Sequence, residues 1–162
     1  MEYFSESGVL ENVRVRYHFR YPIGEPFGDF YRELAKACRG WLDREYSEYQ
    51  GRGITYRSNA LITYSEEGIT SVTLDISLFE KGTGDVKRRF SSQNWLADGR
   101  ILPLFALKDK NMQKSFVHKV LGYFVSGGEI YIFDEKGQKF ATGVKYGKLC
   151  QEILPNNLKN RS

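Results

Sequence analysis

The longest regular pattern of apolar and polar positions lies between Glu25 and Tyr49. Its apolar residues recur every three or four positions, which places them on one face of a helix with the charged residues opposite. Pro26 suits the first helical turn, and Arg39 and Asp43 are spaced for an ion pair. The pattern predicts one helix of roughly 35 Å. Its predicted apolar stripe is Phe27, Phe30, Tyr31, Leu34, Ala37, Cys38, Trp41, Leu42, Tyr46 and Tyr49.

A strict alternation precedes this helix. From Val13 to Tyr21 every second residue is apolar, which is typical of a half-buried strand. The intervening residues form a basic row that is expected to face water. This row consists of Arg14, Arg16, His18 and Arg20.

Three further alternating runs follow the helix, at Ile54–Tyr64, Ile69–Phe79 and Val86–Trp95. The first two are separated by Ser65–Gly68, whose composition is typical of a tight turn. Runs joined by such short connections predict consecutive antiparallel hairpins, and therefore a meander. One face of an antiparallel sheet is free to meet water.

The last third of the chain begins with Asp98-Gly99, a strong tight-turn dipeptide. A second helix is predicted over Lys108–Tyr123, and strands over Glu129–Phe133 and Gln138–Tyr146. The predicted fold class is α+β, an antiparallel sheet with the long helix packed across one face and the second helix before the C-terminal strands. Residues 1–155 are predicted to form a single domain and residues 156–162 a loose tail.

Composition and charge do not change the predicted fold. The chain has 162 residues, of which 41 % are hydrophobic, so a core can form without disulfides. The net charge is +4, and residues 82–162 carry fourteen Lys and Arg against seven Asp and Glu. No secretory signal or membrane span is visible, which predicts a cytoplasmic protein as written. An extracytoplasmic location is expected if the natural N-terminus is missing from this sequence.

Catalytic and metal-binding motifs are absent from the sequence. His18, His118, Cys38 and Cys150 do not lie at ligand spacing from one another, so no metal or other cofactor is predicted. No nucleophile elbow or phosphate loop is present, and no catalytic residue is assigned. The sequence favours a protein that is not an enzyme. An enzyme whose scattered site uses His18 or His118 stays open as an alternative.

The basic row is the best-defined polar constellation, and with Arg57 it forms the candidate binding site: Arg14, Arg16, His18, Arg20 and Arg57. Residues at alternate positions of a strand lie about 6.6 Å apart, close to the spacing of phosphates along a nucleic-acid strand. The row could therefore bind nucleic acid or another polyanion. The alternative is a solvated sheet face whose charges prevent unwanted strand pairing.

One segment, Trp95–Phe105, carries a family resemblance. It combines an acidic-Gly turn with a Leu- and Phe-containing turn, and Phe140–Leu149 provides a closing strand and a Tyr- and Leu-containing element. This order resembles uncharacterised bacterial extracytoplasmic domains of lysozyme-sensing anti-sigma factors, which also occur beside peptidoglycan deacetylase domains. The family's Gly-Gly-Ala-His turn is replaced here by Lys81–Asp85. The resemblance implies a recognition role, and no binding residue of the family is carried over.

Taken with the absence of catalytic motifs, the resemblance favours a non-catalytic recognition domain that binds a protein or a cell-envelope ligand. Nucleic-acid or polyanion binding through the basic sheet face is the first alternative. The identity of the ligand and the oligomeric state are not readable from the sequence.

Overall fold

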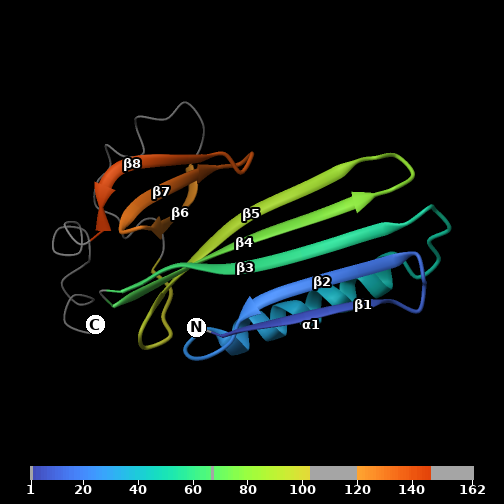
Figure 1. Cartoon of the computed structure of the whole chain (residues 1–162), viewed down its shortest axis with the longest axis horizontal. Coiled ribbons are helices and arrows are strands. Elements are labelled where there is room, and N and C mark those ends of the chain that lie inside the picture. Colours follow the sequence, from blue (N-terminus) through green and yellow to red (C-terminus); the bar gives the residue numbers. More distant parts are fainter. Residues whose placement is uncertain (1, 67, 103–119, 147–162) are drawn as a thin grey trace. The chain divides into compact units, whose positions relative to one another are not determined.

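The computed structural model describes residues 2–66, 68–102 and 120–146, which contain one helix and eight strands in two sheets (Figure 1). These residues belong to two compact units. Unit 1 comprises Met1–Leu61 and Leu74–Phe90, and unit 2 comprises Ile62–Thr73 and Ser91–Ser162. The elements are β1 (Tyr3–Val9), β2 (Val15–Pro22), α1 (Gly28–Glu45), β3 (Ile54–Glu66), β4 (Ile69–Glu80), β5 (Val86–Leu96), β6 (Val120–Ser126), β7 (Glu129–Asp134) and β8 (Lys139–Lys145). The predicted single domain over residues 1–155 stays a prediction, and the predicted tail lies outside the described residues.

Unit 1 is built on a strand, a helix and a second strand that runs parallel to the first. The larger sheet has the order β1-β2-β3-β4-β5, with β1 antiparallel to β2 and β2 parallel to β3. The 18 residues of α1 are about 27 Å long and the eight of β2 about 26 Å. The helix therefore returns the chain to the level at which β2 began. As a result Ile54, the first residue of β3, pairs with Val15, the first residue of β2.

The connection from α1 to β3 is held by a side chain of the loop that precedes β2. The amide of Asn12 donates to the carbonyls of Tyr46 and Tyr49, at 2.9 and 2.8 Å. The last carbonyls of a helix lack partners within the helix, so a side-chain donor stabilises its end. Asn12 thereby binds the C-cap residue Tyr46 and the segment that follows the helix.

The alternation predicted for β2 is confirmed at five positions, whereas Tyr17 and His18 are both half-buried. Val15, Phe19 and Tyr21 are buried, whereas Arg16 and Arg20 are exposed. The Phe19 ring lies 5.8 Å from the Tyr56 ring of β3, in an edge-to-face arrangement. Such aromatic pairs contribute beyond the area that they bury, so they help to hold the two parallel strands together.

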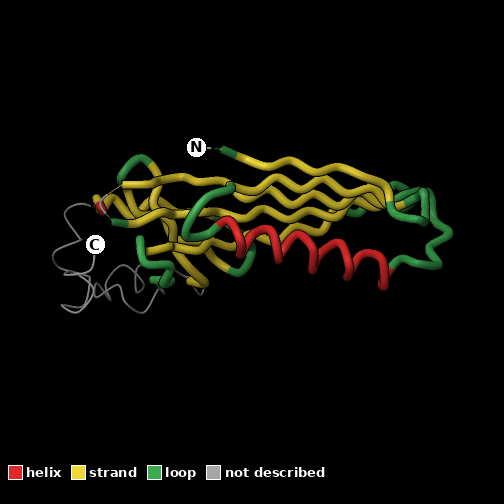
Figure 2. Tube along the Cα trace, turned by 90° about the horizontal axis from the view of Figure 1, so that it is seen from below, coloured by secondary structure: helices red, strands yellow, loops and turns green. Residues whose placement is uncertain are grey.

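Helix α1 runs alongside the strands of unit 1, as Figure 2 shows. Its buried residues are Tyr31, Ala35 and Leu42. Phe30 and Trp41, which the predicted apolar stripe included, remain 39 % and 41 % exposed. The stripe is therefore wider than the face that the sheet covers.

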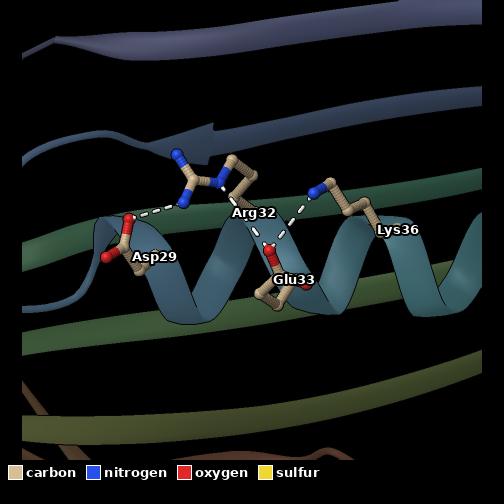
Figure 3. Close-up of polar contacts among 4 residues, drawn as sticks. All are labelled: Asp29, Arg32, Glu33 and Lys36. Atoms are coloured by element: carbon tan, nitrogen blue, oxygen red, sulfur yellow. Dashed lines mark hydrogen bonds and ion pairs between the residues drawn. The ribbon is translucent and has the colours of Figure 1, made fainter.

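The opposite face of α1 carries a chain of ion pairs (Figure 3). Arg32 lies 2.9 Å from Asp29, and Lys36 lies 3.3 Å from Glu33. All four side chains are exposed, so each pair contributes little to stability. Arg39 does not form the ion pair predicted with Asp43, because it pairs instead with Glu6 of β1.

The predicted α+β fold class is wrong, because the described residues form mainly strands, in two sheets, with a single helix. Two differences concern unit 1. The helix is shorter than predicted, since it spans Gly28–Glu45 and reaches neither Glu25 nor Tyr49. The sheet is not an antiparallel meander, because a strand followed by a crossing helix and another strand leads to parallel pairing of β2 with β3. The predicted strands over Ile54–Tyr64, Ile69–Phe79 and Val86–Trp95 are confirmed as β3, β4 and β5.

The predicted second helix is also wrong where it can be compared with the structure. Its first part, up to residue 119, lies outside the described residues. Its last part, residues 120–123, belongs to strand β6. β6 belongs to a second sheet with the order β6-β7-β8.

Unit 2 has its own apolar core around this second sheet. β7 is antiparallel to both β6 and β8, and the predicted strands Glu129–Phe133 and Gln138–Tyr146 are confirmed as β7 and β8. The buried residues of the core are Ile69, Leu102, Tyr123, Val125, Ile130, Ile132 and Tyr146. The predicted turn at Asp98-Gly99 is confirmed, and a bridge joins Trp95 to Ile101 across it.

Polar side chains bind the edge of β6 that faces away from β7. The hydroxyl of Ser71 accepts a bond of 3.0 Å from the Val125 amide and donates to the side-chain oxygen of Asn94. The amide group of Asn94 donates to the Tyr123 carbonyl at 2.9 Å. Thr63 donates to the Val125 carbonyl at 2.6 Å. These residues belong to β3, β4 and β5, so side chains satisfy backbone groups that a neighbouring strand usually satisfies.

Candidate ligand-binding groove

Unit 1 contains a groove between α1 and the strands β4 and β5, with a volume of about 470 Å³. This volume is within the range of ligand pockets. Its floor and walls are apolar or aromatic, and its rim is basic. The lining residues are Trp41, Glu45, Tyr46, Tyr56, Ile76, Leu78, Lys87, Arg88 and Arg89. We call this site the β5 groove.

Three aromatic residues form one wall of the β5 groove. The ring of Trp41 lies 6.0 Å from the ring of Tyr46, nearly perpendicular to it, and 6.3 Å from the ring of Tyr56. These neighbours fix the orientation of the indole, although 41 % of Trp41 is exposed. A large apolar side chain that is both fixed and exposed is typical of the residues that dominate binding energy at interfaces.

The deepest of these rings is held as a neutral phenol. Tyr56 is buried, and its hydroxyl donates to the sulfur of Cys38 at 3.4 Å. Burial raises the pKa of the Tyr56 phenol, the bond to Cys38 acts in the same direction, and the charge of Arg89 partly opposes both. The phenol therefore stays protonated at neutral pH, so the deep wall of the groove carries no charge.

The basic rim consists of three consecutive residues of β5, namely Lys87, Arg88 and Arg89, all of them exposed. Glu45 is the acidic residue among those that line the groove. Consecutive residues of a strand point to opposite faces, so the three cations lie on both sides of β5. The charges and the apolar lining of the groove therefore complement a ligand that is acidic and also carries an apolar group.

β5 is the last strand of its sheet in the part of the chain that the structure describes. Figure 1 shows it at the outer side of β4. Val86–Arg89 therefore has backbone amides and carbonyls on one side that no described strand binds. The edge of the sheet and the apolar groove lie next to each other, since the same residues line both.

The members of the basic row predicted from the sequence do not all lie on one strand. Arg14 precedes β2, and its guanidinium donates to the backbone carbonyls of Gln50 and Gly51, at 2.8 Å for the latter. Arg14 thus joins Asn12 in holding the loop before β3. The alternation around Arg14 therefore indicated a strand residue where the structure has an anchor for a loop.

The other members of the row remain on β2 but differ in their surroundings. Arg20 lies over the ring of Tyr3 at 4.4 Å, a cation–π contact. His18 lies opposite Arg57 in the parallel pairing, and its Nδ1 is 2.7 Å from the hydroxyl of Ser7. Arg57 therefore lies beside His18 on the same face of the sheet, and a binding role for these residues stays a prediction.

Arg14 and Arg16 meet two further cations in a second site, which we call the basic pocket. It has a volume of about 370 Å³. Its lining residues are Val13, Arg14, Arg16, Arg52, Gly53, Ile54, Thr55, Phe79 and Lys81. Four of them are cations and none is acidic. The sequence pattern gave no signal for Arg52 and Lys81, which lie in turns far apart in the chain.

The described ranges contain no group of side chains arranged to bind a metal ion. Within residues 2–66, 68–102 and 120–146, no cluster of three or more His, Cys, Asp or Glu could hold a metal ion. Cys38 is a free thiol. His118 and Cys150 lie outside the described residues. No helix in these ranges has the length and hydropathy needed to cross a bilayer.

Comparisons with known proteins show which solved structures have a fold similar to that of this chain. No family model matches the chain, and no curated protein matches it. A solved structure of a DUF3298 family protein from Pseudomonas aeruginosa PAO1 is similar with a TM-score of 0.62 and 14 % identity, over 97 % of this chain and 94 % of that one. A member of the same family from Bacteroides fragilis has a TM-score of 0.47 and 11 % identity, over 99 % and 96 % of the two chains.

The first likeness shows a shared fold, and that neighbour belongs to an uncharacterised domain family. The resemblance drawn from the sequence is supported to that extent. Neither comparison shows the context of anti-sigma factors or peptidoglycan deacetylases. Because one fold hosts many functions, the function has to be argued from the site.

Proposed function

We propose that this chain is a non-catalytic recognition domain that binds a protein ligand through the β5 groove. The observation that carries the proposal is the position of Trp41. Its ring is fixed by two other aromatic rings, is 41 % exposed, and borders an apolar floor beneath a basic rim. Trp, Tyr and Arg are the residues most enriched among those that dominate protein–protein binding.

The composition of the groove supports a protein ligand over a small polar one. Ile76 and Leu78 form an apolar floor, and the arginines of the rim can bind carboxylates in a bidentate manner. The resemblance of Trp95–Phe105 to domains of anti-sigma factors also favours recognition, without indicating which residues bind.

The test compares two exposed aromatic residues of the same helix. A library of random peptides displayed on phage is selected against the whole chain, and enriched peptides are titrated against variants. Trp41→Ala is expected to weaken binding at least tenfold, since truncating a dominant interface residue costs about 2 kcal/mol or more. Phe30→Ala is the matched control, because Phe30 is 39 % exposed but does not line the groove.

Phe30→Ala is expected to change the affinity less than about twofold, as most interface-distant substitutions do. Equal effects of the two substitutions would contradict the proposal, as would a selection that enriches no peptide. Both variants are checked for an unchanged urea midpoint, so that a loss of binding is not a loss of folding.

A second candidate function, polyanion binding, is favoured by the basic pocket. The pocket gathers Arg14, Arg16, Arg52 and Lys81 without an acidic residue among its lining. A protein that neutralises phosphates releases counterions, so its affinity for nucleic acid falls linearly with salt on a log–log plot. The other proposed binding residues, His18, Arg20 and Arg57, lie on the same strands, β2 and β3.

The test uses a single-stranded RNA oligonucleotide titrated over a range of salt concentrations. Arg16→Ala and Arg52→Ala are each expected to lower the salt slope by about one. Lys136→Ala, at an exposed turn of unit 2, serves as the control and is expected to leave the slope unchanged. Absent or salt-independent binding would exclude this function.

A further inference from the structure

We propose that the ligand of the β5 groove is an extended acidic segment of a partner protein, which pairs as an added strand with Val86–Arg89 and places apolar side chains in the groove. This inference rests on the proposed function and specifies the partner. It is carried by three features that coincide at β5: an open strand edge, an apolar groove beneath that edge, and a run of cations along it.

The open edge provides the backbone recognition. In the described part of the chain, β5 is the last strand of its sheet, and Val86–Arg89 lies in unit 1. All four of these residues are exposed. Main-chain bonds to such an edge supply affinity in complexes formed by strand addition, whereas side-chain pockets supply specificity.

The groove provides the side-chain recognition. Side chains of an added strand would alternate between the two faces of the sheet, so every second one would point towards α1. The groove on that face is lined by the apolar Ile76 and Leu78 and by Trp41, beyond the side chains of β5. The apolar residues of the partner are therefore expected at every second position.

The positive charges of β5 determine which residues of the partner are favoured between its apolar positions. Lys87, Arg88 and Arg89 give a local charge of three against the single Glu45 of the groove lining. The residues between the apolar ones would lie on the face turned away from α1, where glutamate or aspartate would meet the cations of β5 that point to that face, and opposite charges on adjacent strands stabilise their pairing. A basic partner would be repelled.

Protection of the edge is the simpler explanation for these cations, since charged residues on edge strands prevent aggregation. It does not account for the rest of the site. A protective charge needs neither an apolar groove beside the edge nor a tryptophan that is held in place and left 41 % exposed. The coincidence of all three features favours a strand-binding site.

The test uses a synthetic peptide of alternating glutamate and leucine residues, titrated against the whole chain. Two N-methylated versions are compared, one methylated at the leucines and one at the glutamates. An added strand turns only one of these two sets of amides towards β5. One version is therefore expected to bind at least tenfold more weakly and the other to bind almost as well as the unmodified peptide.

Amide hydrogen exchange gives the second measurement. Binding is expected to slow exchange in Val86–Arg89 severalfold, as new backbone bonds form there. Arg88→Glu is expected to weaken binding about tenfold, whereas Lys145→Glu, the same charge reversal on β8, is expected to have little effect. A peptide of alternating lysine and leucine is expected not to bind.

The possible failures can be distinguished. If binding needs Trp41 but both methylated peptides bind equally and Val86–Arg89 exchanges as before, strand addition is wrong and the β5 groove remains the binding site. If the glutamate–leucine peptide does not bind to the chain, or if the lysine–leucine peptide binds equally well, the inference of an acidic strand is overturned. If Trp41→Ala leaves every selected ligand unaffected, the proposed function itself fails.

Discussion

Replacing Ser71 by Ala tests whether side chains stabilise the edge of β6. The Ser71 hydroxyl is buried, accepts from the Val125 amide at 3.0 Å and donates to the side chain of Asn94. Removing it leaves a buried donor and a buried acceptor without these partners. An unsatisfied buried group costs about 1–3 kcal/mol and a lost neutral bond about 1 kcal/mol, so unfolding should become about 2–4 kcal/mol easier.

Urea unfolding gives the measurement, and the two tryptophans help to localise it. Trp95 is buried in unit 2, whereas Trp41 is exposed in unit 1. With Trp41 replaced by Phe, fluorescence reports the surroundings of Trp95. The same background carries the Ser71→Ala variant and its control, so both are compared with one parent protein.

Ser65→Ala is the matched control, because it removes the same atoms from an exposed pair, in which the Ser65 and Thr70 hydroxyls lie 2.9 Å apart. It should change stability by less than about 0.5 kcal/mol. A double-mutant cycle of Ser71→Ala with Asn94→Ala should show coupling of about 0.5 kcal/mol or more. Equal effects at Ser71 and Ser65 would refute the stabilising role of the network.

Two further predictions concern one side chain in each unit. Asn12→Asp should destabilise unit 1 by about 1–3 kcal/mol, since a carboxylate cannot donate to the carbonyls of Tyr46 and Tyr49, and an unchanged urea midpoint would contradict this. Burial raises the pKa of the Tyr123 phenol, whose hydroxyl donates to the Leu102 carbonyl. The unfolded phenol ionises above about pH 10 while the folded one stays protonated, so stability should fall by up to about 1.4 kcal/mol per pH unit from there. Urea midpoints measured between neutral pH and pH about 11 should show this fall in the parent and a weaker one in Tyr123→Phe, and identical slopes would disprove the effect.

Local patterns in the sequence were enough to predict most strands and the neighbouring order of β3, β4 and β5, but not the pairing of β2 with β3. The alternation in β2 and the turns after β3 and β4 arise from neighbouring residues, and these were predicted correctly. The pairing of Val15 with Ile54 depends instead on the length of α1 and on anchoring by Asn12, which no alternation reveals. β1 was not predicted, because Tyr3–Val9 shows no regular alternation.

The β5 groove was missed because the whole stripe of α1 was expected to be buried. A helix face that contacts one sheet covers a limited arc, so the residues at its margins, Phe30 and Trp41, remain exposed. A second signal was available in Lys87-Arg88-Arg89. Three consecutive charges within an alternating strand indicate that both faces of the strand meet water, and charged residues are common on edge strands.

The polar network along β6 has a consequence for misassembly. Its donors and acceptors match the carbonyl of Tyr123 and the amide and carbonyl of Val125, two residues apart on one side of the strand. Sliding the strand by a single position would turn these groups towards β7 and abolish every bond at once. A shift in register would therefore cost much of the free energy of folding in this sheet. The backbone groups at this edge of β6 are already bound by side chains, so the strand of a second molecule cannot pair there to start amyloid-like stacking.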